Sequence, residues 1–519
     1  QKNPTVSYTY DAFDNMTLIA RGDGMKYVLA YNAFHDLESI GIKTDTEEKP
    51  EKLIRYTYKS GNGRLKEMEY ANGDRMKATY NATGQMVGER WLDKNGVEIA
   101  RYKYAYDGDG NIVRSLDISG KKEYNYMYEE GKLVRATETD ITLSGDIVTA
   151  KTVVNTVRYY YDSEGNLARK VIAPAGAVSQ TVFYETSDDT NTVVKFQLPL
   201  AENTAIKPCV TAHSKNDSFG RKEFDELQLG KAFLYRRFDY HAGALTDAHT
   251  ENDKVKSTPT TQLVSKISFS DGRTIEYEYD KEERITKVID SVDGTTEYTY
   301  DALGQLLTET NGTGVVNTMT YDNYGNITKK NGKIYTYDTV WHDLLLSVGG
   351  DEIDYDFQGN PTSYLGHTLT WEKGRQLKSY DSNTYTYNAN GIRTSKTVGG
   401  VKHTYTLDGT KILRETWGSN TLIPLYDNEE NVCGISYNYT PYYFIKNQQG
   451  DVIAIADQNA NVVARYCMSP KETDLPSHAS RFQKQGEMFK ICTRFFERTW
   501  LWMENFQKLP WNDKRAYSC

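Results

Sequence analysis

The chain has 519 residues, and its 71 acidic against 62 basic side chains give a net charge of −9. Surfaces that bind nucleic acid need clustered Lys and Arg to displace counterions, so this acidic balance argues against a nucleic-acid partner. No run of 18 apolar residues occurs, which argues against a membrane span, and the opening QKNPTVSYTYD lacks the basic and apolar regions of an export signal.

The first predicted block, residues 1–170, is built from a phrase that reads YTYDAFDNMTLI from Tyr8, YAYDGDGNIVRS from Tyr104 and YYYDSEGNLARK from Tyr159. The Y-x-Y spacing puts two rings on one face of a strand. The Asp that follows can bond backbone N–H groups two positions on, and the next Gly or Asn tolerates positive φ, so the chain turns there. An aliphatic residue then begins a return strand, and each phrase predicts one β-hairpin. The repeat-defining residues of this block are Tyr10, Asp11, Tyr106, Asp107, Tyr161 and Asp162.

Residues 171–262 are predicted to be an irregular repeat and loop region. It keeps repeat-like words such as DSFGRKEFDEL and then passes into the polar stretch GALTDAHTENDKVKSTPTT, the best candidate for an exposed loop. His241 and His249 lie here with Asp239 and Asp247, but a spacing of eight residues fits no common metal site. We therefore expect no metal and no other cofactor.

The second predicted block, residues 263–466, has the most regular repeats. Tyr279, Tyr300 and Tyr321 follow one another at a 21-residue step. Ten Tyr-Asp dipeptides occur in the chain against roughly three expected by chance, so the pattern is periodic. Because no hairpin is stable alone, neighbouring hairpins must pair, which predicts an all-β fold with rows of Tyr on one face of a long sheet. The repeat-defining residues here are Tyr279, Asp280, Tyr300, Asp301, Tyr321, Asp322, Tyr337, Asp338, Tyr355 and Asp356.

These phrases resemble the RHS/YD-repeat family, which includes bacterial RHS and wall-associated polymorphic-toxin proteins, the cocoon of insecticidal toxin complexes and the YD shell of teneurins. The resemblance covers about 466 residues. It implies a strip of β-hairpins that spirals into a hollow shell, and in bacterial members this shell commonly encloses a C-terminal toxin. We therefore expect a structural scaffold for such a toxin, secreted or at the cell surface as part of a longer chain, since the sequence opens in mid-repeat.

The segment YFIKNQQGDVIAIADQNANVVARY resembles the start of the RHS core, but the chain departs from the family after Tyr466. The family's RYYDP stretch and aspartyl self-cleavage site have no match here, so no catalytic residue is carried over. Residues 467–519 have three interpretations: a frameshifted or degenerate tail, a divergent effector domain, or a real but unusual core. A two-base deletion in the expected core word Tyr-Asp-Ala-Trp would give the Tyr466-Cys467-Met468 that stands here.

The remaining residue patterns favour structural roles over catalysis. Asp280 and Asp301 are explained by their turns, where water keeps carboxylates ionised. The five Cys form no metal-ligand spacing, and no nucleophile signature occurs. We therefore expect no enzymatic activity and no self-processing. Trp341, Trp371 and Trp417 are interpreted as packing residues, and the alternative function is an extracellular adhesion or carbohydrate-binding module that stacks Tyr and Trp rings on sugars.

Overall fold

The computed structural model describes residues 6–22, 24–188, 191–197, 209–242, 260–339, 341–427 and 429–466. Within these ranges the regular structure is entirely β-strand, in 42 strands. Each strand for which a pairing is defined runs antiparallel to its neighbours, as in β22–β23 and β23–β24. The predicted all-β class and the strip of repeated hairpins are confirmed.

The first half of the strands is β1 (Val6–Tyr10), β2 (Met16–Arg21), β3 (Lys26–Tyr31), β4 (Leu37–Lys43), β5 (Glu51–Tyr58), β6 (Leu65–Tyr70), β7 (Arg75–Tyr80), β8 (Met86–Leu92), β9 (Glu98–Tyr106), β10 (Ile112–Asp117), β11 (Lys122–Glu129), β12 (Lys132–Ser144), β13 (Ile147–Tyr161), β14 (Leu167–Pro174), β15 (Gln180–Asp188), β16 (Asn191–Gln197), β17 (Cys209–Asn216), β18 (Lys222–Leu229), β19 (Ala232–Ala242), β20 (Thr260–Phe269) and β21 (Thr274–Tyr279).

The second half is β22 (Ile285–Asp290), β23 (Gly294–Tyr300), β24 (Leu306–Asn311), β25 (Gly314–Tyr321), β26 (Ile327–Lys330), β27 (Lys333–Tyr337), β28 (Leu345–Val348), β29 (Asp351–Glu352), β30 (Asp354–Tyr355), β31 (Pro361–Tyr364), β32 (His367–Glu372), β33 (Gln376–Tyr380), β34 (Asn383–Tyr387), β35 (Arg393–Val398), β36 (Val401–Asp408), β37 (Lys411–Trp417), β38 (Asn420–Tyr426), β39 (Val432–Tyr437), β40 (Thr440–Lys446), β41 (Val452–Ala456) and β42 (Val462–Arg465).

The chain forms two compact units. Unit 1 comprises Gln1–Glu185, Val194–Val210 and Thr336–Pro441, and unit 2 comprises Thr186–Val193, Thr211–Tyr335 and Tyr442–Cys519. Each unit combines segments that lie far apart in the sequence. The units therefore divide the chain differently from the predicted blocks at residues 1–170, 171–262 and 263–466. The block boundaries stay a prediction, and the predicted tail at 467–519 lies outside the described residues.

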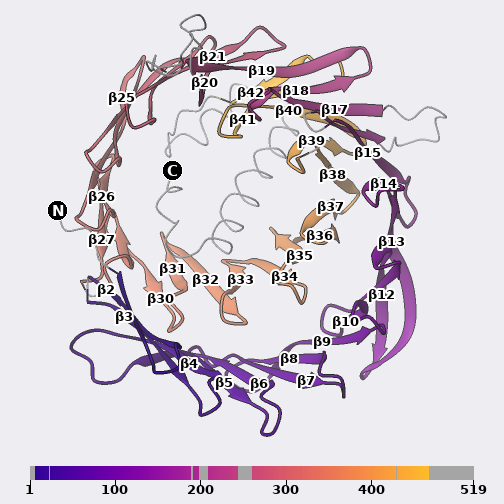
Figure 1. Ribbon diagram of the computed structural model, residues 1–519, viewed down its shortest axis with the longest axis vertical. Helices are drawn as coiled ribbons and strands as arrows, with labels where there is room; N and C mark the ends of the chain where they lie inside the picture. Colours follow the sequence, from indigo (N-terminus) through magenta and orange to yellow (C-terminus); the bar gives the residue numbers. More distant parts are fainter. Residues whose placement is uncertain are drawn as a thin grey trace, which may run out of the picture. The chain divides into compact units, whose positions relative to one another are not determined.

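Unit 1 contains two layers of strands, and Figure 1 shows β34–β38 lying beside β9–β14. Val157, Tyr159 and Ile172 of β13 and β14 form a buried apolar cluster with Leu413 of β37. A second cluster, on β7–β9, includes the buried Trp91 and packs against Ala389. Burial of these apolar faces holds the two layers together.

Unit 2 is layered in the same way. The turn before β41 meets the strip through Arg236, which donates to the Asn447 carbonyl at 2.9 Å. After β42, Arg465 pairs with Asp271 at 2.9 Å. Ile453 and Ile455 of β41 are fully buried.

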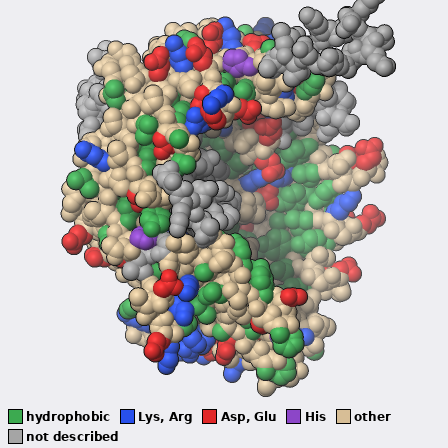
Figure 2. All heavy atoms as spheres, turned by 60° about the vertical axis from the view of Figure 1, so that its left-hand side comes forward, with side chains coloured by type: hydrophobic (Ala, Val, Ile, Leu, Met, Phe, Trp, Pro, Cys, Tyr) green, Lys and Arg blue, Asp and Glu red, His purple; other side chains and the backbone are tan. Residues whose placement is uncertain are grey.

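The surface carries both signs of charge. Over the face drawn in Figure 2, acidic and basic side chains are interspersed among uncharged ones. Among the described residues, no helix is long and apolar enough to cross a membrane.

Candidate functional site

The repeated Asp closes each hairpin turn with its carboxylate. In the turn after β23, Asp301 Oδ1 accepts the backbone N–H groups of Leu303 at 2.8 Å and Gln305 at 2.9 Å. Asp301 Oδ2 accepts the side-chain amide of Gln305 at 2.6 Å. Gly304 takes φ +81°, the left-handed conformation that follows a tight turn in a bulged hairpin. The same pair of backbone bonds, to the second and fourth residues after the Asp, is made by Asp11, Asp107, Asp162, Asp280, Asp322 and Asp356.

Asp338 closes a longer loop. Its backbone N–H donates to the Leu344 carbonyl at 2.9 Å, and its carboxylate accepts the N–H of Trp341 at 2.6 Å. The loop therefore keeps an Asp-closed start but has extra residues before the return strand β28.

These bonds lower the pKa of two of the turn carboxylates as follows. The side-chain amide of Asn15 holds the pKa of Asp11 below its usual value, and the guanidinium of Arg284 does the same for Asp280. Arg284 also donates to the Asp301 backbone carbonyl at 3.3 Å, so it links two consecutive turns. A general acid must hold a proton near neutral pH, and a lowered pKa makes Asp11 and Asp280 unsuited to that role.

A Tyr at the end of a strand, most often the Tyr before the turn Asp, ties its hairpin to the preceding one. Tyr300 at the end of β23 donates its hydroxyl to the Ile285 carbonyl at the start of β22, at 2.7 Å. The strand register shifts at this Tyr, between Thr299 and Tyr300, which is a β-bulge. We call this bond the tyrosine tie. Its members are Tyr31 to Met16, Tyr58 to Leu37, Tyr106 to Met86, Tyr161 to Leu133, Tyr240 to Lys222, Tyr279 to Val264, Tyr300 to Ile285, Tyr321 to Leu306, Tyr355 to Leu345, Tyr387 to Leu377 and Tyr426 to Ile412.

The tyrosine ties include six of the eight predicted repeat tyrosines. Tyr10 lies on β1, which pairs with β2, and is 51% exposed. Tyr337 ends β27 and is half-buried. Sequence reasoning placed the rings on one face but missed the carbonyl acceptors. A regular signal exists for four ties only, in which the acceptor lies 15 residues before the Tyr, as between Ile285 and Tyr300; in the other ties this step varies from 10 to 28 residues.

Sequence reasoning also missed a buried polar cluster in unit 1. Lys373, 8% exposed and at φ +49° in the turn after β32, donates its Nζ to the Tyr102 hydroxyl at 2.6 Å. Burial lowers the pKa of Lys373, against the attraction of Glu372 and Asp117. Next to it, the Gly374 carbonyl accepts from Asn360 at 2.8 Å. These contacts dock one hairpin turn onto another layer of strands, which is a structural role.

His241 and Asp239, which we predicted not to bind a metal, lie in β19 and make ordinary packing contacts. His241 Nε2 lies 2.8 Å from the Tyr277 carbonyl, and its ring meets Tyr279 edge-on at 5.5 Å. Asp239 pairs across strands with Lys266. His249 and Asp247 lie outside the described residues. In the part of the chain that the structure describes, no three His, Cys, Asp or Glu residues are grouped to hold a metal ion.

The three Trp residues are half-buried in unit 1. Trp371 donates its indole N–H to the Pro361 carbonyl at 2.7 Å. Trp417 stacks between His403 at 4.8 Å and Tyr437 at 6.0 Å. Trp341 lies against Gly359, where an added Cβ would be 3.5 Å from the indole ring.

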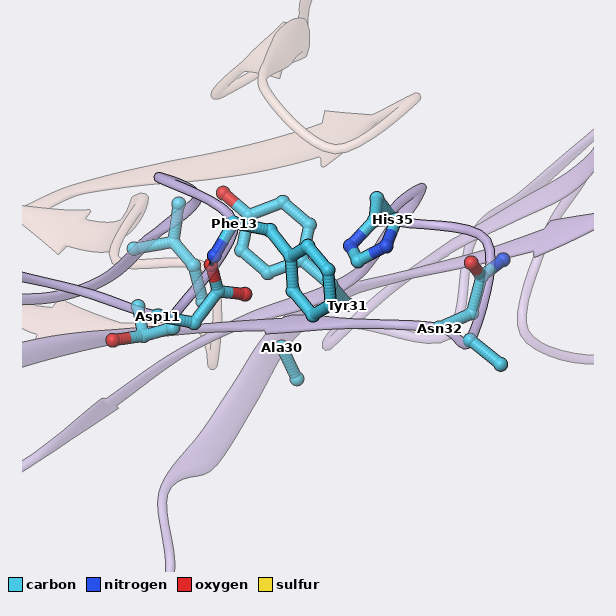
Figure 3. Close-up of a pocket in the computed structure, with 9 residues that line it drawn as sticks. Asp11, Phe13, Ala30, Tyr31, Asn32 and His35 are labelled. Atoms are coloured by element: carbon cyan, nitrogen blue, oxygen red, sulfur yellow. Dashed lines mark hydrogen bonds between the residues drawn. The ribbon is translucent and has the colours of Figure 1, made fainter.

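A surface pocket of about 420 Å³ lies in unit 1 beside the turns that follow β1 and β3 (Figure 3). The lining includes Asp11, Tyr31 and Asn32. Phe13 and His35 face each other there with ring centroids 4.2 Å apart, and Figure 3 shows both rings on the same side of the strand that carries Tyr31. Phe13 is 69% exposed, so the pocket offers water an aromatic face beside polar groups.

Comparison with known proteins finds the same repeat. The RHS Repeat family model matches residues 284–316, which include the Arg284 turn contact and the Tyr300 tie. The predicted resemblance to the RHS/YD-repeat family is confirmed. A tRNA3(Ser)-specific nuclease WapA of Bacillus spizizenii is 32% identical over 152 residues, and a tRNA nuclease WapA of Bacillus subtilis is 30% identical over 152 residues. Each match covers 27% of this chain and 6% of the relative, so the chain spans a small part of these proteins.

Solved structures show the same fold. The chain is similar to one in the crystal structure of TcdB2-TccC3-Cdc42, with a TM-score of 0.63 at 13% identity, covering 89% of this chain and 26% of that one. It is also similar to TcdB2-TccC3 without its hypervariable C-terminal region, with a TM-score of 0.64, 13% identity and the same coverage. As an RHS/YD-repeat protein, the chain is a repeat scaffold of the kind found in toxin-associated proteins.

Proposed function

We propose that this chain is the shell part of a secreted or cell-surface bacterial toxin protein and that it encloses or presents a C-terminal toxin. The observation that carries the proposal is the tyrosine tie, which recurs in both units and links a hairpin to the one before it. A scaffold needs neighbouring hairpins fixed to one another, and each tie does this with one side chain and one backbone carbonyl. The similarity to toxin-associated repeat proteins supports the toxin as cargo.

Protection of a cargo tests the proposal. A small, protease-sensitive domain is fused behind residue 519, and its cleavage is compared with that of the same domain fused before residue 1. An enclosing scaffold should slow cleavage of the C-terminal fusion at least ten-fold relative to the N-terminal one. Equal cleavage rates for the two fusions would contradict enclosure.

We further propose that the chain has no hydrolytic activity, does not cut itself and does not bind nucleic acid. The lowered pKa values of turn carboxylates such as Asp11 and Asp280, and the mixed surface charge, support this. The purified chain should keep its mass during incubation near neutral pH without added protease. A discrete fragment that forms at a rate independent of protein concentration, and that one Asp substitution abolishes, would show a catalytic site.

The pocket of Figure 3 favours a second candidate function, carbohydrate binding in adhesion. An exposed aromatic face beside hydrogen-bonding groups is the chemistry that recognises a sugar ring. On a glycan array, binding by the chain should fall at least ten-fold in Phe13→Ala. Phe219→Ala is the matched control, because Phe219 is 65% exposed at the same turn position in unit 2. Absence of saturable binding by the unaltered chain would reject this candidate.

A further inference from the structure

A small cavity lies between the two strand layers of unit 1. Its walls come from β13–β15 on one side and from β36–β38 on the other. Most of the lining is apolar, including Ile172, Leu413 and Ile423. The room inside for the centre of a water-sized sphere is about 10 Å³, enough for one water molecule.

Two polar side chains from opposite layers line this cavity. Asn155 of β13 is 3% exposed, and its Oδ1 atom is buried without a hydrogen-bond partner among the described residues. Arg414 of β37 contributes a buried Nε atom that likewise has no partner in the described part of the chain. One of these atoms accepts a hydrogen bond and the other donates one.

The rest of the Arg414 guanidinium has one weak contact, from a terminal nitrogen to the Tyr439 hydroxyl at 3.5 Å. Leaving a buried donor or acceptor unsatisfied is unfavourable, because the group has lost its hydrogen bond to bulk water. An apolar cavity would not require these two residues, because Leu and Met fill such space at no polar cost. An Asn and an Arg facing one small cavity from two layers therefore point to a shared polar ligand.

We propose that this cavity is a binding site for a single water molecule that accepts from Arg414 Nε–H and donates to Asn155 Oδ1. The water joins the two layers of unit 1 by hydrogen bonds, in addition to the direct bonds from Tyr159 and Lys170 to Asp408. Thr406 and the buried Gln180 also line the cavity and offer further polar partners, which a bound water usually needs. The site is independent of the proposed toxin-scaffold function.

A high-resolution crystal structure of the whole chain tests the site directly. We expect one spherical density peak within hydrogen-bond distance of both Asn155 Oδ1 and Arg414 Nε. A direct bond between the two side chains would overturn the proposal. So would an anomalous peak after soaking in bromide, because it would identify an anion site on Arg414.

A double-mutant cycle in solution provides a second test. Asn155→Leu and Arg414→Met should each lower the melting temperature, since each leaves the other's polar atom without its bridge. The double variant should lose clearly less than the sum of the two single losses, because it leaves neither atom stranded. Tyr439→Phe is the control for the other Arg414 contact, and its effect should add to that of Asn155→Leu. Strict additivity of Asn155→Leu and Arg414→Met would refute a shared water.

Discussion

Removing one tyrosine tie should loosen a single hairpin joint and leave the rest of the strip intact. Tyr300→Phe deletes the hydroxyl that donates to the Ile285 carbonyl at 2.7 Å and keeps the ring, which lies 5.0 Å from the Arg284 guanidinium. The net value of such a bond is about 1 kcal/mol. Because unfolding in repeat proteins is largely local, that loss corresponds to about five-fold faster opening of the joint.

Hydrogen exchange followed by mass spectrometry measures this opening peptide by peptide. Peptides from β22 and β23 should exchange about five-fold faster in Tyr300→Phe, while peptides from β7 and β8 should be unchanged. Tyr10→Phe is the matched control, because Tyr10 holds the same place in its phrase but is half exposed on β1. Unchanged exchange in β22–β23, or an equal effect of Tyr10→Phe on β1–β2, would refute the reasoning.

Two further predictions concern the turns and a buried carboxylate. Gly304→Ala should cost about 1 kcal/mol, because Gly304 has φ +81° while its added Cβ would make only an ordinary contact with the Arg284 side chain at 3.5 Å, whereas Glu283→Gly should relieve a comparable strain at φ +63°; thermal melts that move both variants in the same direction would contradict this. Burial alone would raise the pKa of Glu123, but bonds from Arg114, Lys151 and Asn125 lower it to about 2. The pKa of Glu123 is therefore lower in the folded state than in the unfolded state. Its contribution of about 2–3 kcal/mol to the free energy of unfolding is present above about pH 4.3 and is lost as the pH falls towards 2. Glu123→Gln should therefore be less stable than the unaltered chain at pH 7 and approach it in stability near pH 2, and denaturant titrations showing a pH-independent difference would contradict the assignment.

The hairpins could be predicted from the sequence because their causes are local. The alternation of Tyr298 and Tyr300 sets the strand face, and Asp301 bonds groups within four residues of itself. The layers could not be predicted, because their contacts join distant residues by no regular step. Lys373 lies 271 residues from Tyr102, and in the sequence it stands in a charged hairpin turn that is typical of a solvated loop. Burial there comes from the opposing layer of strands.

The difference between side-chain and backbone partners explains why Tyr and Asp are the most regular residues of the repeat. A tyrosine tie needs a phenol hydroxyl on one side, but its acceptor is a backbone carbonyl, which every residue supplies. The acceptors accordingly differ in side chain, from Met16 to Lys222 and Ile285. The Asp likewise bonds backbone N–H groups, and its one side-chain partner can be Asn, Arg or Gln, as at Asn15 and Arg284. Each contact requires only the Tyr or Asp side chain that bonds a backbone group, so the positions between these residues are free to vary. The scaffold can therefore keep its geometry while most of its surface sequence changes.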